Sequence, residues 1–134
     1  LLAPPPTPTL LQRALAHRSR ARQHHRHAER LRARLDAARS RSVRLAQGAS
    51  CRFVSAPAGL FGWVDTGVDT DQMALRMLDK GYLLAPGALF HASRQPSPLM
   101  RINFATTQDA TFWRVFGRTR AAMASSAGQW NRGG

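Results

Sequence analysis

Apolar residues recur along the first third of the chain with the period of a helix. Residues 9–47 contain no glycine or proline and are rich in Ala, Leu, Arg and Gln, which are good helix formers. The apolar positions spaced by three and four residues are Ala28, Leu31, Leu35 and Ala38. They form a narrow stripe, so we predict a long helix over residues 10–48 that needs a surface to lie on. A Pro-rich extended segment, residues 1–9, precedes it.

After residue 48 the pattern changes to short apolar runs that are separated by glycine and proline. The runs predicted to be strands are residues 51–56, 60–64, 82–85 and 99–105. In the last run the side chains alternate between two faces, and the apolar face carries Met100, Ile102 and Phe104. The more polar face carries Leu99, Arg101, Asn103 and Ala105.

A well-marked short helix is predicted between the second and third strands. It begins after Asp69, whose carboxylate can cap it, and Gln72 three residues later completes a capping box. Val68 and Met73 have the spacing of a hydrophobic staple around this start. Gly81 is placed just beyond the last turn, where helices commonly end.

A last helix is predicted over residues 108–123, and its packed face carries Phe112, Val115, Phe116 and Thr119. The elements then follow in the order helix, strand, strand, helix, strand, strand, helix. This order predicts an α+β fold, in which residues 49–122 form a small, largely antiparallel sheet with helices packed on one face. Residues 123–134 are expected to be a disordered tail.

Length and composition restrict the class of protein. A chain of 134 residues with 43% apolar residues fits one small domain or part of a larger one, and it excludes a TIM barrel of about 250 residues. No apolar run reaches the roughly 20 residues that a membrane span needs. The single cysteine, Cys51, is expected to be a structural thiol in a reducing, cytoplasmic compartment. Because the sequence begins without Met, the chain is expected to start inside a longer protein.

The positive charge is concentrated in the first part of the chain. The net charge is +13, and residues 1–52 hold twelve Arg and two acidic residues, a net charge of +10. A segment this basic is typical of proteins that bind nucleic acid. However, the Arg residues lie around the whole circumference of the predicted helix, and no aromatic residue for base stacking precedes Phe53. An autonomous nucleic-acid-binding protein therefore stays an alternative.

Few residues are arranged for catalysis or ligand binding. Arg101 is the leading candidate, because a guanidinium on a half-buried strand can bind a carboxylate through two parallel N–H groups; a solvated Arg on an edge strand is the simpler alternative. Four histidines lie on the predicted long helix: His17, His24, His25 and His27. Because no suitable shell completes them and the surrounding Arg residues repel a cation, no metal site is predicted. No catalytic nucleophile or phosphate-binding loop is recognised.

Three segments resemble motifs of the fold-type-I pyridoxal-phosphate aminotransferases. Residues 57–63, PAGLFGW, are similar to the family's P-x-G-G-[LM]-F-x-W, although Ala58 stands where a first Gly is common. Residues 81–90, GYLLAPGALF, are similar to G-V-x-[VL]-x-P-G-x-x-F, and residues 99–105, LMRINFA, to x-x-[LM]-R-[LIF]-[NS]-[FY]. The segments follow in the family's order and spacing. The long helix resembles the family's helix that leads into the C-terminal small domain.

Within that superfamily, residues 84–109 resemble the MocR-type regulators, in which a GntR-type winged helix precedes an aminotransferase-like domain. The resemblance implies the C-terminal fragment of a pyridoxal-phosphate-dependent transcriptional regulator. Its parent is expected to be a cytoplasmic homodimer that binds DNA through a domain absent from this chain. A fragment of a genuine class I/II aminotransferase that acts on amino acids is the alternative.

The resemblance also implies a role for Arg101, which matches the Arg that binds the α-carboxylate of the amino-acid substrate or effector. The residues that bind pyridoxal phosphate, including the Schiff-base lysine, belong to the family's large domain and are not in this chain. Lys80 is not that lysine, because it lies on the helix between two of the matched segments. The chain alone is therefore not expected to be an enzyme.

Overall fold

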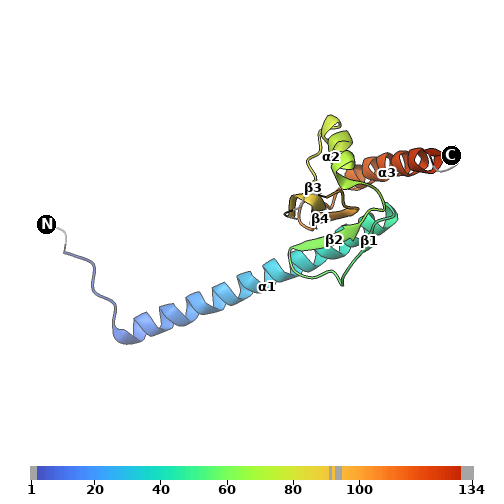
Figure 1. Cartoon of the computed structure of the whole chain (residues 1–134). Helices are drawn as coiled ribbons and strands as arrows, with labels where there is room; N and C mark the ends of the chain where they lie inside the picture. Colours follow the sequence, from blue (N-terminus) through green and yellow to red (C-terminus); the bar gives the residue numbers. More distant parts are fainter. Residues whose placement is uncertain (1–2, 91, 93–94, 131–134) are drawn as a thin grey trace. The chain divides into compact units, whose positions relative to one another are not determined.

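The computed structural model describes residues 3–90, 92 and 95–130 (Figure 1). The chain divides into two compact units, Leu1–Arg34 and Leu35–Gly134. The long predicted helix is present as α1 (Leu10–Gly48), whose first part belongs to the first unit and whose end belongs to the second. None of the described helices has the length and apolar composition needed to cross a membrane.

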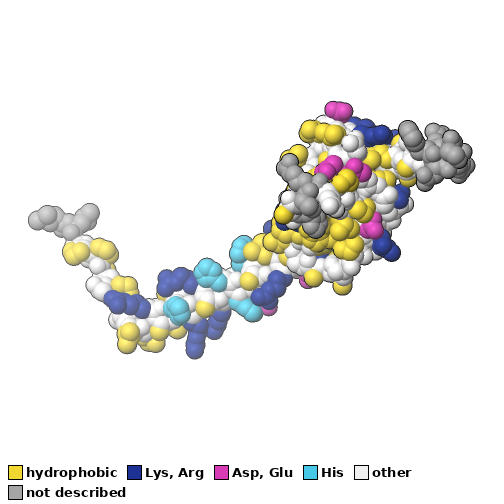
Figure 2. All heavy atoms as spheres, viewed as in Figure 1, with side chains coloured by type: hydrophobic (Ala, Val, Ile, Leu, Met, Phe, Trp, Pro, Cys, Tyr) yellow, Lys and Arg dark blue, Asp and Glu magenta, His cyan; other side chains and the backbone are white. Residues whose placement is uncertain are grey.

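The described part of the first unit consists of an extended segment and the first turns of α1. Thr9 begins the helix with a reciprocal capping box, because Gln12 N donates to Thr9 Oγ1 at 3.1 Å and Thr9 N donates to Gln12 Oε1 at 2.8 Å. Ala28 is the only half-buried residue described in this unit, and Leu31 of the predicted stripe is 50% exposed. Figure 2 shows Arg and His side chains along the surface of this helix.

The second unit contains a four-stranded antiparallel sheet in the order β1-β2-β4-β3. Its strands are β1 (Arg52–Phe53), β2 (Phe61–Asp65), β3 (Ala85–Pro86) and β4 (Leu99–Asn103). Although β4 is the last strand in sequence, it lies between β2 and β3. The predicted α+β fold with a small antiparallel sheet is confirmed.

Helices pack on one face of this sheet. Besides the end of α1 they are α2 (Thr70–Asp79) and α3 (Ala110–Trp130), and a short 3-10 helix, η1 (Gly87–Phe90), follows β3. The buried cluster between the layers includes Ala46, Val64, Met73, Met77, Met100, Ile102, Phe104, Phe112, Trp113 and Phe116. The predicted apolar face of β4 is confirmed, since its three residues are at most 3% exposed.

Close packing in this cluster explains a glycine in β2. A Cβ atom added to Gly62 would lie 2.7 Å from Phe104 Cζ and 3.0 Å from Phe53 Cε1. The aromatic rings therefore occupy the space that a side chain at Gly62 would need.

The N-cap of α2, the staple around it and the glycine after it follow the sequence signals, whereas no hydrogen bond from Gln72 back to Asp69 is found among the described residues. Asp69 is the N-cap, and its Oδ1 accepts a hydrogen bond from Asp71 N at 3.0 Å. Val68 and Met73 are both buried, as a hydrophobic staple requires. Gly81, just past the helix, has a φ of +89°, a conformation that glycine adopts without strain.

Three predicted strands are shorter than expected, and β4 ends at Asn103 instead of residue 105. The pairing covers Arg52–Phe53 instead of residues 51–56, and Ala85–Pro86 instead of residues 82–85. Tyr82 N still donates to Met77 O at 2.9 Å. Tyr82, which was predicted to begin a strand, therefore forms one of the hydrogen bonds that end α2.

The helix α3 continues to Trp130, beyond residue 123, where the disordered tail is expected to begin. The extension begins with residues 124–127, ASSA, which contain no glycine or proline, and Ser126 Oγ donates back to Ala122 O at 3.0 Å. Residues 131–134 lie outside the described residues.

Candidate functional site

One face of the sheet packs against the helices, and the opposite face, here called the open face, lies away from the core. Arg101 lies in the middle of the open face. Arg101 is the central residue of β4 and pairs with Trp63 of β2 and Ala85 of β3. Residues directly opposite one another in antiparallel strands share a face. Phe61 pairs with Asn103, so it belongs to the same face as Arg101. Arg101 is half-buried, as its central position predicts.

Aromatic rings surround the guanidinium of Arg101. Its Cζ atom lies 4.4 Å from the ring centroid of Phe61 and 4.5 Å from that of Phe90. Both distances are within the range of a cation–π interaction. Trp63 packs edge-on against Phe90 with 5.1 Å between the ring centroids. The side chain of Arg101 is thus held by residues from β2 and η1.

The guanidinium has no protein anion beside it in the described part of the chain. The three ion pairs found there are His25–Glu29, Arg39–Asp36 and Arg52–Asp65, and no side-chain hydrogen bond of Arg101 is formed with a described residue. The carboxylate of Asp65 on β2 is already bound by Arg52 at 3.3 Å. No acidic side chain of the described residues therefore engages the N–H donors of Arg101.

A groove of about 320 Å³ extends along β4 from Arg101. It follows the edge that β3 leaves open, since β3 pairs only with Met100 and Arg101. The groove is lined by Tyr82, Leu83, Leu84, Ala85, Met100, Arg101, Ile102, Asn103, Thr106, Thr107 and Phe112. It is mostly apolar, and Arg101 is the charged residue in its wall.

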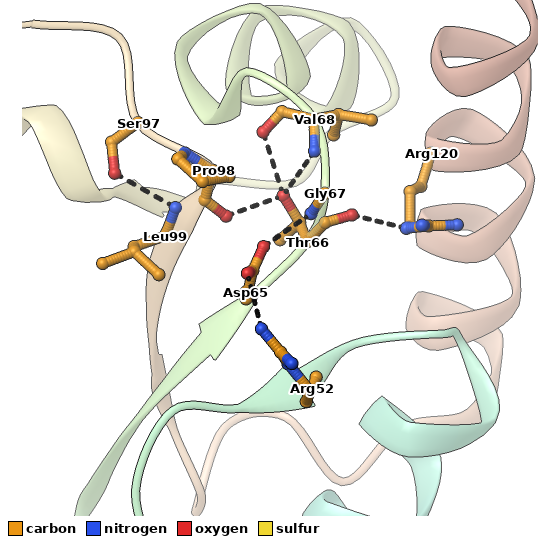
Figure 3. A network of polar contacts seen from close by, with 9 residues as sticks. All are labelled: Arg52, Asp65, Thr66, Gly67, Val68, Ser97, Pro98, Leu99 and Arg120. Atoms are coloured by element: carbon orange, nitrogen blue, oxygen red, sulfur yellow. Dashed lines mark hydrogen bonds and ion pairs between the residues drawn. The ribbon is translucent and has the colours of Figure 1, made fainter.

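Polar contacts fasten the turn after β2 to the start of β4 (Figure 3). Thr66 Oγ1 lies 2.9 Å from Pro98 O and 3.1 Å from Val68 O, which share its one hydroxyl hydrogen, and Arg120 Nε of α3 donates to Thr66 O at 2.5 Å. Gly67 N donates to Asp65 Oδ1 at 2.9 Å. These bonds set where β4 begins beside β2, and thereby the register that places Arg101 opposite Trp63.

The other sequence candidates lie away from this face. Cys51 is buried, and burial raises the pKa of its thiol to about 12, so it is protonated at neutral pH and fits a structural role. Lys80 is the C-cap of α2, and its Nζ donates to Thr119 Oγ1 of α3 at 2.5 Å.

The histidines of α1 are exposed on the helix surface. His25 Nε2 lies 3.0 Å from Glu29 Oε1 one turn along the helix. Within residues 3–90, 92 and 95–130, no three His, Cys, Asp or Glu side chains are gathered as a metal site would require.

Phe61, Trp63 and Phe90 are site residues that the sequence analysis did not single out. A signal for two of them was present, because Phe61 and Trp63 alternate with the core residues Gly62 and Val64 along β2. Phe90 had no such signal, since its contact with Arg101 depends on where η1 folds back over the sheet.

Comparison with known proteins supports the fold. No family model matches the chain, and no curated protein matches it. A solved structure of LysN, the α-aminoadipate aminotransferase of Thermus thermophilus, is similar with a TM-score of 0.66 at 18% identity, over 87% of this chain and 32% of that one.

Two further similar structures come from Pyrococcus horikoshii. Its kynurenine aminotransferase aligns with a TM-score of 0.59 at 21% identity, over 76% of this chain and 26% of that one. Its aromatic aminotransferase aligns with a TM-score of 0.55 at 17% identity, over 76% and 28%. The chain thus has the fold of part of an aminotransferase and spans about a third or less of these proteins.

Proposed function

We propose that this chain is an aminotransferase-like small domain of a larger pyridoxal-phosphate-dependent protein, in which Arg101 binds the α-carboxylate of an amino acid. The observation that carries the proposal is the guanidinium of Arg101, half-buried on the open face with no described anion beside it. The similarity of the chain's fold to part of an aminotransferase supports the proposal.

The residues of this chain do not fit a complete cofactor site. When bound, pyridoxal phosphate supplies an electron sink at the α-carbon of an amino acid, and it is attached through a lysine. The single lysine of the chain, Lys80, joins α2 to α3 on the helix side of the sheet. Under this proposal another part of the protein holds the cofactor, and the chain alone has no catalytic activity.

Two kinds of parent protein use such a domain. A MocR-type transcriptional regulator is favoured by the resemblance of residues 84–109, and in it cofactor and effector binding would bias an attached DNA-binding domain within a homodimer. A genuine aminotransferase is favoured by the similar solved structures. A winged-helix segment encoded upstream of Leu1 would support the regulator, and its absence the enzyme.

The role of Arg101 is tested with Arg101→Lys in the intact protein that contains this chain. Lysine keeps the charge but loses the two parallel N–H groups, so we expect the dissociation constant for the amino acid to rise roughly ten- to hundredfold. Calorimetric titration measures it. Arg76→Lys, on the exposed side of α2, is the matched control and should leave the affinity unchanged. Equal affinities for Arg101→Lys and the control would contradict the proposed role.

A further inference from the structure

Two phenylalanines on the open face have no place in the core. Phe61 and Phe90 are each 43% exposed, and neither belongs to the buried cluster between sheet and helices. Large aromatic side chains usually contribute to a protein by burial. Both side chains remain about half in solvent, and both lie over the guanidinium of Arg101. Contact with that group, rather than burial in the core, is therefore the interaction that the two rings share.

We propose that Phe61 and Phe90 are positioning residues that hold the Arg101 guanidinium ready for a carboxylate. This inference rests on the proposed function of Arg101. A long Arg side chain on an open face has many rotamers, and ordering it upon binding would weaken the affinity. Rings from two different elements restrict that freedom before the ligand arrives.

The ring contacts also leave the useful part of the guanidinium available. Stacking on an aromatic face occupies the flat surface of the group, while its N–H donors point outward along its edge. A planar carboxylate binds to that edge through two parallel hydrogen bonds. The rings further exclude water from the flat surface, which strengthens the charge-assisted bonds.

A second layer supports this arrangement. Trp63, directly opposite Arg101 in the sheet, packs edge-on against Phe90 at 5.1 Å. Phe90 lies in η1, directly after the β3 strand that pairs with Arg101. Phe61 thus reaches Arg101 from β2, which is hydrogen-bonded to β4. Phe90 reaches it from η1, which directly follows another strand bonded to β4.

The test compares Phe61→Leu and Phe90→Leu with Phe61→Tyr and Phe90→Tyr in the intact protein. Leucine keeps apolar volume but removes the π face, whereas tyrosine keeps it. We expect the leucine variants to bind the amino acid roughly three- to tenfold more weakly, as loss of one partly exposed cation–π contact implies, and the tyrosine variants to bind normally. Leu75→Ala, exposed on α2, is the control for a surface apolar change.

A second ligand separates positioning from folding. This ligand is the amine that corresponds to the amino acid without its carboxylate, and it is titrated against each variant. The ratio of the affinity for the amino acid to the affinity for the amine does not depend on the fraction of folded protein. We expect the leucine variants to lower the affinity for the amino acid and to leave that for the amine unchanged. An equal loss for both ligands would overturn the positioning role.

Different results would contradict this inference and the proposed function. If Arg101→Lys leaves amino-acid affinity unchanged, the proposed function is wrong. If Arg101→Lys weakens binding, the leucine substitutions should have little further effect in that background, because lysine does not stack on the rings as a guanidinium does. Leucine variants that bind normally, or whose effects simply add to that of Arg101→Lys, overturn the positioning role alone.

Discussion

Arginine is used differently in the two units of the chain. In the first unit the Arg side chains between residues 13 and 34 are exposed, and none forms an ion pair within the described residues. In the second unit Arg41 Nε donates to Gln108 O at 2.9 Å and Arg120 Nε donates to Thr66 O at 2.5 Å, while Arg101 lies over two aromatic rings. The densest charge and the most specific contacts of arginine therefore occur in different units.

The difference shows that a count of charges does not locate a site. Successive Arg residues four apart on α1, such as Arg18, Arg22 and Arg26, repel one another, and the nearest acid, Glu29, is paired with His25. Arg101 belongs to a strand with no other charged residue. Its environment, rather than the local charge density, makes it a candidate for binding a ligand.

The largest expected effect contrasts a core residue with an exposed one. Phe116 on α3 is fully buried, and Phe116→Ala should lower the free energy of unfolding by about 3–5 kcal/mol. Leu31→Ala on the exposed part of α1 should change it by less than about 0.5 kcal/mol. Denaturant unfolding measures both. A comparable loss for Leu31→Ala would show that the first unit also packs through its apolar stripe.

A comparison of two separate glycines is expected to show a smaller effect on the free energy of unfolding. Gly62→Ala places a Cβ 2.7 Å from Phe104 Cζ, so we expect a loss of about 1–3 kcal/mol from overpacking. Gly48, at the end of α1, has nothing within 4 Å of an added Cβ, and alanine there should be neutral or stabilising by up to about 1 kcal/mol. Thermal unfolding of the two variants checks the contrast. Equal stabilities would mean that the sheet accommodates the extra methyl group.

The smallest effect compares two arginines directly. Arg120→Met removes the bond to Thr66 O that fastens the turn after β2, and it should cost about 1 kcal/mol of unfolding free energy. Arg18→Met on the exposed helix removes a repelling charge, and it should leave stability within about 0.5 kcal/mol of the wild type. Urea unfolding at two salt concentrations measures both. A larger loss for Arg18→Met would reverse the comparison.

The sequence predicts those features that depend on near neighbours. The cap at Asp69, the staple of Val68 and Met73, and the alternation along β4 all involve residues within a few positions of one another. The same holds for the capping box of Thr9 and Gln12, which is readable from the spacing although it was not among the predicted features. Local hydrogen bonds and side-chain periodicity determine these features.

Features that depend on distant parts of the chain were missed. The contact of Phe90 with Arg101 requires η1 to lie above the sheet, and nothing within a few residues of Phe90 specifies that position. The short β3 results from the way Tyr82 closes the end of α2. The helix α3 extends to Trp130, beyond the predicted end at residue 123, although chain termini are commonly poorly ordered.

The place of β4 within the sheet has a consequence for the order of assembly. Strands β2 and β3 are not bonded to each other, since each pairs with β4, which follows both of them in the chain. During synthesis, the sheet can close only after residues 99–103 have left the ribosome, and until then both inner edges lack their partner. The strand that carries Arg101 is thus the piece that joins the two halves of the sheet, so the candidate site and the completed sheet form in one step.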